Sequence, residues 1–146
     1  MTASTTLQAK EVPMDSPKTA TSNKRLWASR IMGGLPALFL LVDGTMKLFK
    51  PAVVVEASAQ LGYPESTLVG IGIALLVSTL LYVVPRTSML GAILLTGYLG
   101  GAVATHVRVG GPAFNIVFPV IFGSLLWGGL WLRDRRIEAL IPLRAY

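Results

Sequence analysis

Apolar residues occur along this chain in four long runs, separated by short segments that are polar or contain proline. Each run is close to the roughly 20 residues that a helix needs to cross a bilayer. Pro85 ends the second run, because proline lacks the amide hydrogen that a continuing helix requires. The pattern predicts an all-α integral membrane four-helix bundle, with helices over about residues 26–49, 66–84, 88–107 and 112–132.

The connections between the predicted helices differ in length. Residues 85–87 and 108–111 are short enough to force antiparallel hairpins between the second and third helices and between the third and fourth. The first connection is long, and residues 51–61 have apolar positions with helical recurrence. They predict a short helix at the membrane interface, before a Gly62-Tyr63-Pro64 turn.

Composition narrows the class of protein. Hydrophobic residues make up 53% of the chain and charged residues 14%, a balance typical of a membrane protein. The chain has no cysteine, which excludes disulfides, thiolate metal sites and iron–sulfur clusters. The net charge of +6 does not indicate nucleic-acid binding, because the Lys and Arg residues flank the apolar runs instead of forming one basic face.

The distribution of Lys and Arg also predicts the orientation in the membrane. If the N-terminus is cytoplasmic, ten of the 13 basic residues lie inside, and Lys47, Lys50 and Arg108 lie outside. Both termini are therefore expected in the cytoplasm. Residues 1–25 are rich in Thr, Ser, Ala and Lys and lack apolar periodicity, which predicts a disordered cytoplasmic tail before a domain over residues 26–146.

Small residues recur on one face of the third predicted helix, at Gly97, Gly100, Gly101 and Ala104. Helices in lipid associate through close backbone contact and polar bonds, because water provides no drive for them to do so. We expect this stripe to pack against a neighbouring helix within the bundle. A contact face for a second copy of the chain is the alternative.

Polar side chains near the outer ends of the predicted helices form a candidate ligand site. Asp43 and Lys47 are four residues apart, on one face of the first helix. A charge at the bilayer centre costs about 2.5–3.5 kcal/mol on insertion scales, so both residues should pair, face the bundle interior or lie near the interface. The predicted topology brings other polar residues to the same level. The candidate residues are Asp43, Lys47, Glu56, His106, Arg108 and Asn115.

A structural interpretation of the same residues stays open. Asp43 and Lys47 form a plausible structural pair, and Lys47 and Arg108 stand at helix ends, where long basic side chains reach the interface. At 100° per residue, His106 projects away from Gly97 and Gly101, so it is also explained as an inert interfacial residue. A single histidine without cysteine predicts no conventional metal site. No catalytic residue is assigned.

Several motifs together resemble one family. GAILLTGYLGGAVATHVRVG, preceded by YVVPRTSML, is similar to the third-helix signature of the DoxX-like family of small bacterial four-helix membrane proteins. The resemblance extends to DGTMKLFKP, LGYP, FPVIFGSLLWGGLWLRD and RIEALIPLR, and it covers about residues 26–144.

The resemblance implies a multi-pass protein of the bacterial inner membrane, embedded in the lipid bilayer. The family's namesakes are associated with quinol oxidation and thiosulfate:quinone oxidoreduction, so the resemblance suggests a quinone as ligand, although the sequence shows no cofactor motif. The first hypothesis is a non-catalytic or accessory component that presents a quinone-type, lipid-soluble ligand to a redox partner protein. A small homo-oligomeric transporter or channel is the alternative. A self-sufficient oxidoreductase has the least support, because the chain carries no evident redox group.

Overall fold

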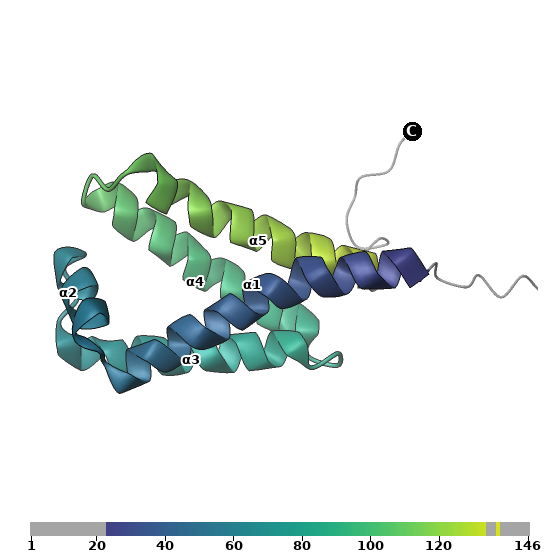
Figure 1. Ribbon diagram of the computed structural model, residues 1–146, viewed down its shortest axis with the longest axis horizontal. Coiled ribbons are helices and arrows are strands. Elements are labelled where there is room, and N and C mark those ends of the chain that lie inside the picture. Colours follow the sequence, from purple (N-terminus) through teal and green to yellow (C-terminus); the bar gives the residue numbers. More distant parts are fainter. Residues whose placement is uncertain (1–22, 134–136, 138–146) are drawn as a thin grey trace, which may run out of the picture.

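The computed structural model describes residues 23–133 and residue 137. This part of the chain is all-helical and has four long helices, α1, α3, α4 and α5, with the short helix α2 between the first two (Figure 1). Each long helix is long and apolar enough to cross a membrane, which confirms the predicted all-α fold with four helices that could span it. The bounds are α1 Asn23–Phe49, α2 Ala52–Gln60, α3 Glu65–Val83, α4 Ser88–Arg108 and α5 Ala113–Arg133.

The start of α1 corrects one sequence boundary. The tail was expected to reach residue 25, but α1 already begins at Asn23. Residues 1–22 of that predicted tail, and most of the RIEALIPLR motif, lie outside the described residues. The long first connection does contain a helix: α2 begins after Pro51 and ends before the turn at Gly62, whose φ of +81° suits glycine.

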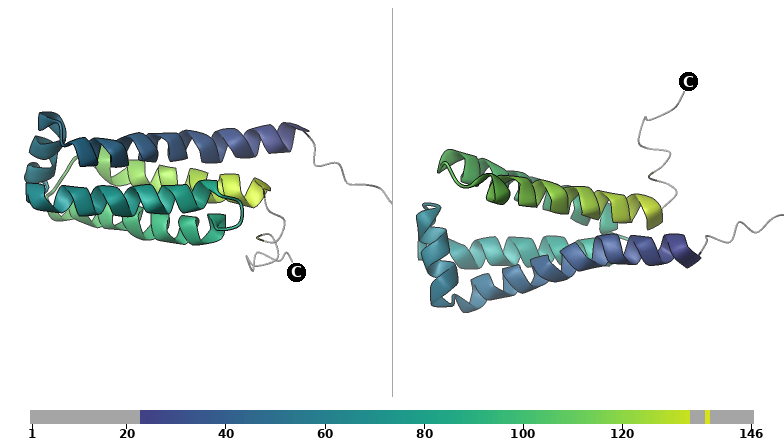
Figure 2. Two further views of the ribbon diagram at one scale, coloured as in Figure 1. Left: turned by 90° about the horizontal axis from the view of Figure 1, so that it is seen from below. Right: turned by 45° about the horizontal axis from the view of Figure 1, so that its top comes forward.

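The four long helices form a ring in which each packs against two neighbours. Helix α1 packs on α3 and α5, and α4 packs on the same two helices. Figure 2 shows that the pair α1 and α3 and the pair α4 and α5 approach each other at one end and separate towards α2. Helix α2 lies across the end where they separate (Figure 1).

The end where the pairs approach, called the closed end here, is packed through glycines and leucines. Gly33 of α1 faces Gly129 of α5 so closely that a Cβ at Gly129 would lie 2.6 Å from the Gly33 nitrogen. Tyr82 of α3 donates a buried hydrogen bond of 2.8 Å to the Leu126 carbonyl of α5. Close backbone approach is how helices gain contact in lipid, so this end is the tightly packed part of the bundle. Leucines of the bundle core are among the most buried side chains: Leu75, Leu95, Leu126 and Leu130.

The small-residue stripe of α4 does not make such a contact. A Cβ at Gly97, Gly100 or Gly101 would meet nothing within 4 Å, and Ala104 is exposed. The expected packing of this stripe inside the bundle is therefore wrong for the described chain. The close approaches are made by other glycines, because the spacing of small residues does not specify which helix face meets a neighbour. The alternative, contact with a second copy, stays a prediction.

Candidate functional site

A cavity of about 770 Å³ lies at the end where the helix pairs separate, called the open end here. All four long helices and α2 contribute side chains to its wall. Its volume is within the range of about 300–1,000 Å³ that small-molecule sites occupy. Most of the wall is aliphatic or aromatic, and a few polar groups converge on it. This combination is typical of a binding site for a small, largely apolar molecule.

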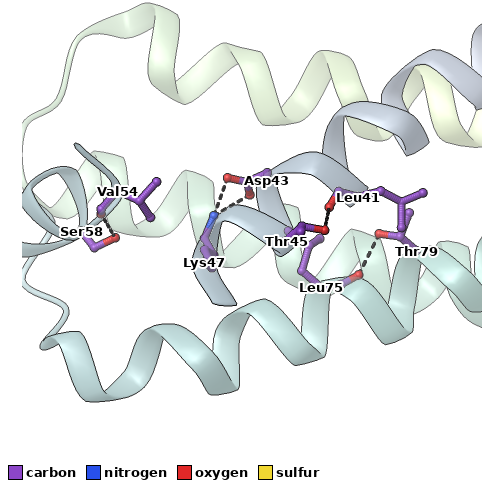
Figure 3. A network of polar contacts seen from close by, with 8 residues as sticks. All are labelled: Leu41, Asp43, Thr45, Lys47, Val54, Ser58, Leu75 and Thr79. Atoms are coloured by element: carbon purple, nitrogen blue, oxygen red, sulfur yellow. Dashed lines mark hydrogen bonds and ion pairs between the residues drawn. The ribbon is translucent and has the colours of Figure 1, made fainter. Parts of the chain in front are cut away.

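Asp43 and Lys47 place an ion pair on the α1 wall of the cavity. The Lys47 ammonium lies 2.6 Å from Oδ1 and 2.5 Å from Oδ2 of Asp43, one helical turn away (Figure 3). Close packing holds this part of α1 against α3, since a Cβ at Gly72 would lie 3.0 Å from Cβ of Lys47. The Asp43 side chain is 33% exposed and that of Lys47 15%. The pair is therefore half-buried and lines the cavity.

The neighbouring hydroxyl groups in Figure 3 are used within their own helices. Thr45, Ser58 and Thr79 each donate to the carbonyl oxygen four residues earlier, at 2.7 Å in every case. Such local bonds satisfy a hydroxyl group in an apolar environment. The Asp43–Lys47 pair is thus the charged group that this region presents to the cavity.

Three polar side chains line the cavity without a hydrogen-bond partner among the described residues. Tyr98 and His106 line it from α4, and Asn115 lines it from α5. Within the described chain, the side chains of these residues make no hydrogen bond. By contrast, the Thr105 hydroxyl is 2.8 Å from that of Tyr63 and also donates to the Gly101 carbonyl. The cavity therefore offers a phenol, an imidazole and an amide to whatever enters it.

Phenylalanine rings form the wall of the cavity between α1 and α5. Phe39 lies edge-on to Phe118 and Phe122, with ring centroids 5.5 Å and 5.1 Å away. Phe118 also packs against Phe122, at 4.3 Å, and against Phe114, at 5.6 Å. Aromatic side chains at these distances stabilise one another, and an aromatic wall favours a flat ring in a ligand.

Comparison with known proteins places the chain in a family. The model of the DoxX-like family matches residues 31–129 of the 146-residue chain. The chain belongs to the DoxX-like family. None of the curated proteins or solved structures compared with the chain matches it. The matched range includes every polar residue of the cavity wall and all or most of each long helix. This DoxX-like protein is thus a membrane protein with four candidate spans.

The structure brings four of the six candidate residues of this DoxX-like protein together. Asp43, Lys47, His106 and Asn115 line the cavity, and Gly97 and Gly101 line it as well. His106 and the two glycines thus share the cavity wall, whereas the sequence placed them on opposed faces of one helix. The wall spans a wide arc of α4, from Gly97 through Tyr98 to His106.

Two candidate residues lie outside the cavity wall of the DoxX-like protein. Arg108 is exposed, and its Nη2 donates at 2.8 Å to the Leu61 carbonyl, so it ties the turn after α2 to the end of α4. Glu56 is exposed and does not line the cavity, so the structure does not bring it together with the other candidate residues. Helix α2 turns a different face to the cavity, formed by Val53, Val54, Ala57 and Ser58.

Sequence reasoning missed Tyr98 and the phenylalanines. Tyr98 lies inside an apolar, glycine-rich segment. A polar side chain at membrane depth is energetically costly, and such residues often mark a functional site. That signal was available. The role of the phenylalanines could not be predicted from the sequence, because aromatic residues are common on every face of a membrane helix. These phenylalanines line a cavity only because α1 and α5 separate.

Proposed function

We propose that this protein is an accessory component of the membrane that binds a neutral, ring-containing lipid of the quinone class in the open-end cavity and presents it to a redox partner. One observation carries the proposal. A largely apolar cavity of about 770 Å³ contains a phenol, an imidazole and an amide that have no hydrogen-bond partner in the described chain. A ligand with oxygen atoms on a ring would satisfy these groups, and its apolar remainder would contact the aliphatic and aromatic wall.

The ion pair favours a neutral head group over a charged one. Asp43 and Lys47 already neutralise each other, so a carboxylate or phosphate entering the cavity would have no free counter-charge on their helix. The Lys47 ammonium has three N–H donors, and two of them are directed at Asp43. The third is left for a carbonyl oxygen. A quinone has two ring carbonyls, no charge and a flat ring that suits the phenylalanine wall.

Electron transfer is assigned to a partner because the sequence has no cysteine and a single histidine. A bound quinone would supply the two-electron redox chemistry, and the residues of this chain would bind and orient it. We place the open end on the outer side of the bacterial inner membrane, with both termini in the cytoplasm, on the strength of the Lys and Arg distribution. The redox partner would be identified by a separate experiment, its capture from intact membranes.

A transport function has less support from the packing. A transporter or channel needs a path that reaches both membrane faces, whereas the closed end is filled by side chains such as Leu126 and Leu130, which are 1% exposed. The Gly33–Gly129 approach leaves no room there for a solute. A single copy therefore has an end that binds and an end that blocks passage.

Two adjacent glycines allow a sharp test of binding. Gly101 lines the cavity and Gly100 does not, and a Cβ at either would meet no other atom within 4 Å. Gly101→Leu should fill part of the cavity, whereas Gly100→Leu should only extend the outer surface. Both substitutions improve helix propensity by about 1 kcal/mol, so neither should weaken α4. The measurement is the quinone content, by mass spectrometry, of protein purified in mild detergent, and the affinity for added short-chain ubiquinone.

The proposal predicts that parent and Gly100→Leu proteins retain quinone and that Gly101→Leu loses it, with affinity lower by about tenfold or more, which corresponds to 1.4 kcal/mol. Asp43→Asn and His106→Ala should also reduce the affinity. A parent protein that neither carries quinone nor binds the added probe would overturn the proposal. So would equal binding by the two glycine variants, because the ligand would then lie elsewhere.

A further inference from the structure

We infer that the lipid ligand enters and leaves the cavity sideways from the bilayer, through the seam between the C-terminal half of α1 and the N-terminal half of α5, and that Phe39 limits its passage. The inference rests on the proposed binding function. It names a route and a residue for that function. Both helices are long and apolar enough to span a membrane, and in a bilayer the seam between two neighbouring spans faces lipid.

The seam between α1 and α5 changes character along its length. At the closed end it is shut by the approach of Gly33 to Gly129, where a Cβ would lie 2.6 Å from a backbone nitrogen. Phe39 then packs edge-on against Phe118 and Phe122. Towards α2 the two helices separate (Figure 2), and past Phe39 no side-chain hydrogen bond or ring contact joins α1 and α5 among the described residues. Phe39 thus makes the last ring contact across it.

Phe39 belongs both to the cavity wall and to the outer surface. It lines the cavity, and yet 46% of it is exposed. Phe114, across the seam on α5, also lines the cavity and is 71% exposed. A cavity whose lining residues are this exposed reaches the surface at these residues. Rotation of one phenylalanine side chain would widen or narrow such an opening without moving a helix.

The route from water at the same end runs past helix α2, whose Val53 lines the cavity and is 77% exposed. Helix α2 lies across it, and its Val53, Val54, Ala57 and Ser58 line the cavity from that side. Polar contacts hold the segments that flank α2. Arg108 donates to the Leu61 carbonyl, the Tyr63 and Thr105 hydroxyls are 2.8 Å apart, and Lys50 pairs with Glu65 at 3.2 Å. Moving α2 aside would break these polar contacts, whereas opening the seam at Phe39 would break only ring contacts.

The absence of native cysteine makes a direct test of the route simple. Ala102→Cys places one thiol on the cavity wall, on α4. In liposomes its rate of reaction with N-pyrenylmaleimide, an apolar reagent dissolved in the lipid, measures access from the bilayer. Ile93→Cys is the reference: Ile93 is on the same helix, is exposed and is not part of the cavity wall.

The route predicts opposite effects of two substitutions at Phe39. Phe39→Ala should speed the labelling of Ala102→Cys and Phe39→Trp should slow it, each by about tenfold, the effect of a 1.4 kcal/mol change in barrier. Leu38 supplies the matched controls: it is 64% exposed on the same helix and does not line the cavity. Leu38→Ala and Leu38→Trp should leave the rate unchanged. The Ile93→Cys rate should not respond to Phe39.

The labelling experiments test the route independently of the binding proposal, because the maleimide reagent is not a quinone. Labelling that ignores Phe39 but slows with Ala74→Trp would overturn the inference in favour of the seam between α3 and α4, where Ala74 and Gly97 line the cavity. Labelling by a charged, water-soluble maleimide that speeds up in Arg108→Ala would overturn it in favour of the α2 end. Quinone binding could survive either result. Conversely, labelling governed by Phe39 without any quinone binding would support the route and reject the ligand.

Discussion

The closed and open ends of this bundle are made from the same helices and similar residues, but they are packed in opposite ways. At the closed end glycines bring α1 and α5 into backbone contact, and the buried Tyr82 hydroxyl is bonded to Leu126. At the open end Gly97 and Gly101 face empty space, and the hydroxyl of Tyr98 has no partner in the described chain. One set of glycines holds helices together, and the other leaves room.

This difference in packing indicates that one end of a small membrane protein can stabilise the fold while the other end is left free to bind a ligand. Four helices of about 20 residues have little interior, so a cavity can form only where some contacts are given up. The tightly packed closed end provides the contacts that keep the helices associated. The open end can then keep unsatisfied polar groups, which are the usual mark of a site.

The largest expected effect comes from breaking the closed end. Gly129→Ala would place a methyl group 2.6 Å from the nitrogen and 2.8 Å from Cα of Gly33, and backbone atoms cannot move aside as a side chain can. We expect a loss of about 3 kcal/mol or more in the free energy of unfolding, at the upper end for overpacking. Thermal unfolding in detergent measures it. Gly100→Ala is the control at an open position and should be neutral or slightly stabilising.

Equal stability of the Gly129→Ala and Gly100→Ala proteins would show that α1 and α5 are not in contact at these glycines. The distinction between a closed and an open end would then lose its main support.

A smaller effect is expected from the ion pair at the open end. Asp43→Ala leaves the half-buried Lys47 ammonium without its partner. We expect a loss of about 2 kcal/mol, less than the 3–5 kcal/mol typical of a fully buried pair, because Asp43 is a third exposed. The double variant Asp43→Ala/Lys47→Ala should be more stable than Asp43→Ala alone, since it removes the unpaired charge.

A double-mutant cycle of the unfolding free energies shows whether Asp43 and Lys47 are energetically coupled. Losses from Asp43→Ala and Lys47→Ala that simply add would indicate no coupling between the two side chains, contrary to the 2.6 Å and 2.5 Å contacts. Coupling together with normal quinone binding by the double variant would show that the pair is structural, as one interpretation of the sequence held.

The fold could be predicted from the sequence because it depends on patterns within single segments. The four apolar runs are of span length, Pro85 stops one of them, and the recurrence in residues 51–61 indicates α2. The residues that hold the helices together were not predictable in this way. Nothing local distinguishes Gly33 and Gly129, which touch, from Gly97 and Gly101, which do not.

The candidate site was predictable only as far as the level of each residue along the membrane normal. Asp43, Lys47, His106 and Asn115 stand near the same ends of their helices, and they do meet at the cavity. The sequence fixes the angle between residues of one helix but not the direction in which that helix faces its neighbours. Glu56 was misplaced for this reason, and the cavity itself arises from the separation of two helix pairs.

The smallest expected effect on stability, and the clearest contrast, comes from removing one hydroxyl at each end. Tyr82→Phe removes the buried 2.8 Å hydrogen bond to Leu126 and should cost about 1 kcal/mol, without altering quinone affinity. Tyr98→Phe removes a hydroxyl that bonds to no described residue, so stability should hardly change. If that hydroxyl donates to a bound quinone, the affinity should fall by about fivefold, the worth of one hydrogen bond near 1 kcal/mol. Thermal unfolding and quinone titration of both variants would show either this reversal, in which each end has its own role, or two equal losses of stability, in which case Tyr98 supports the fold and the open end is not specialised for binding.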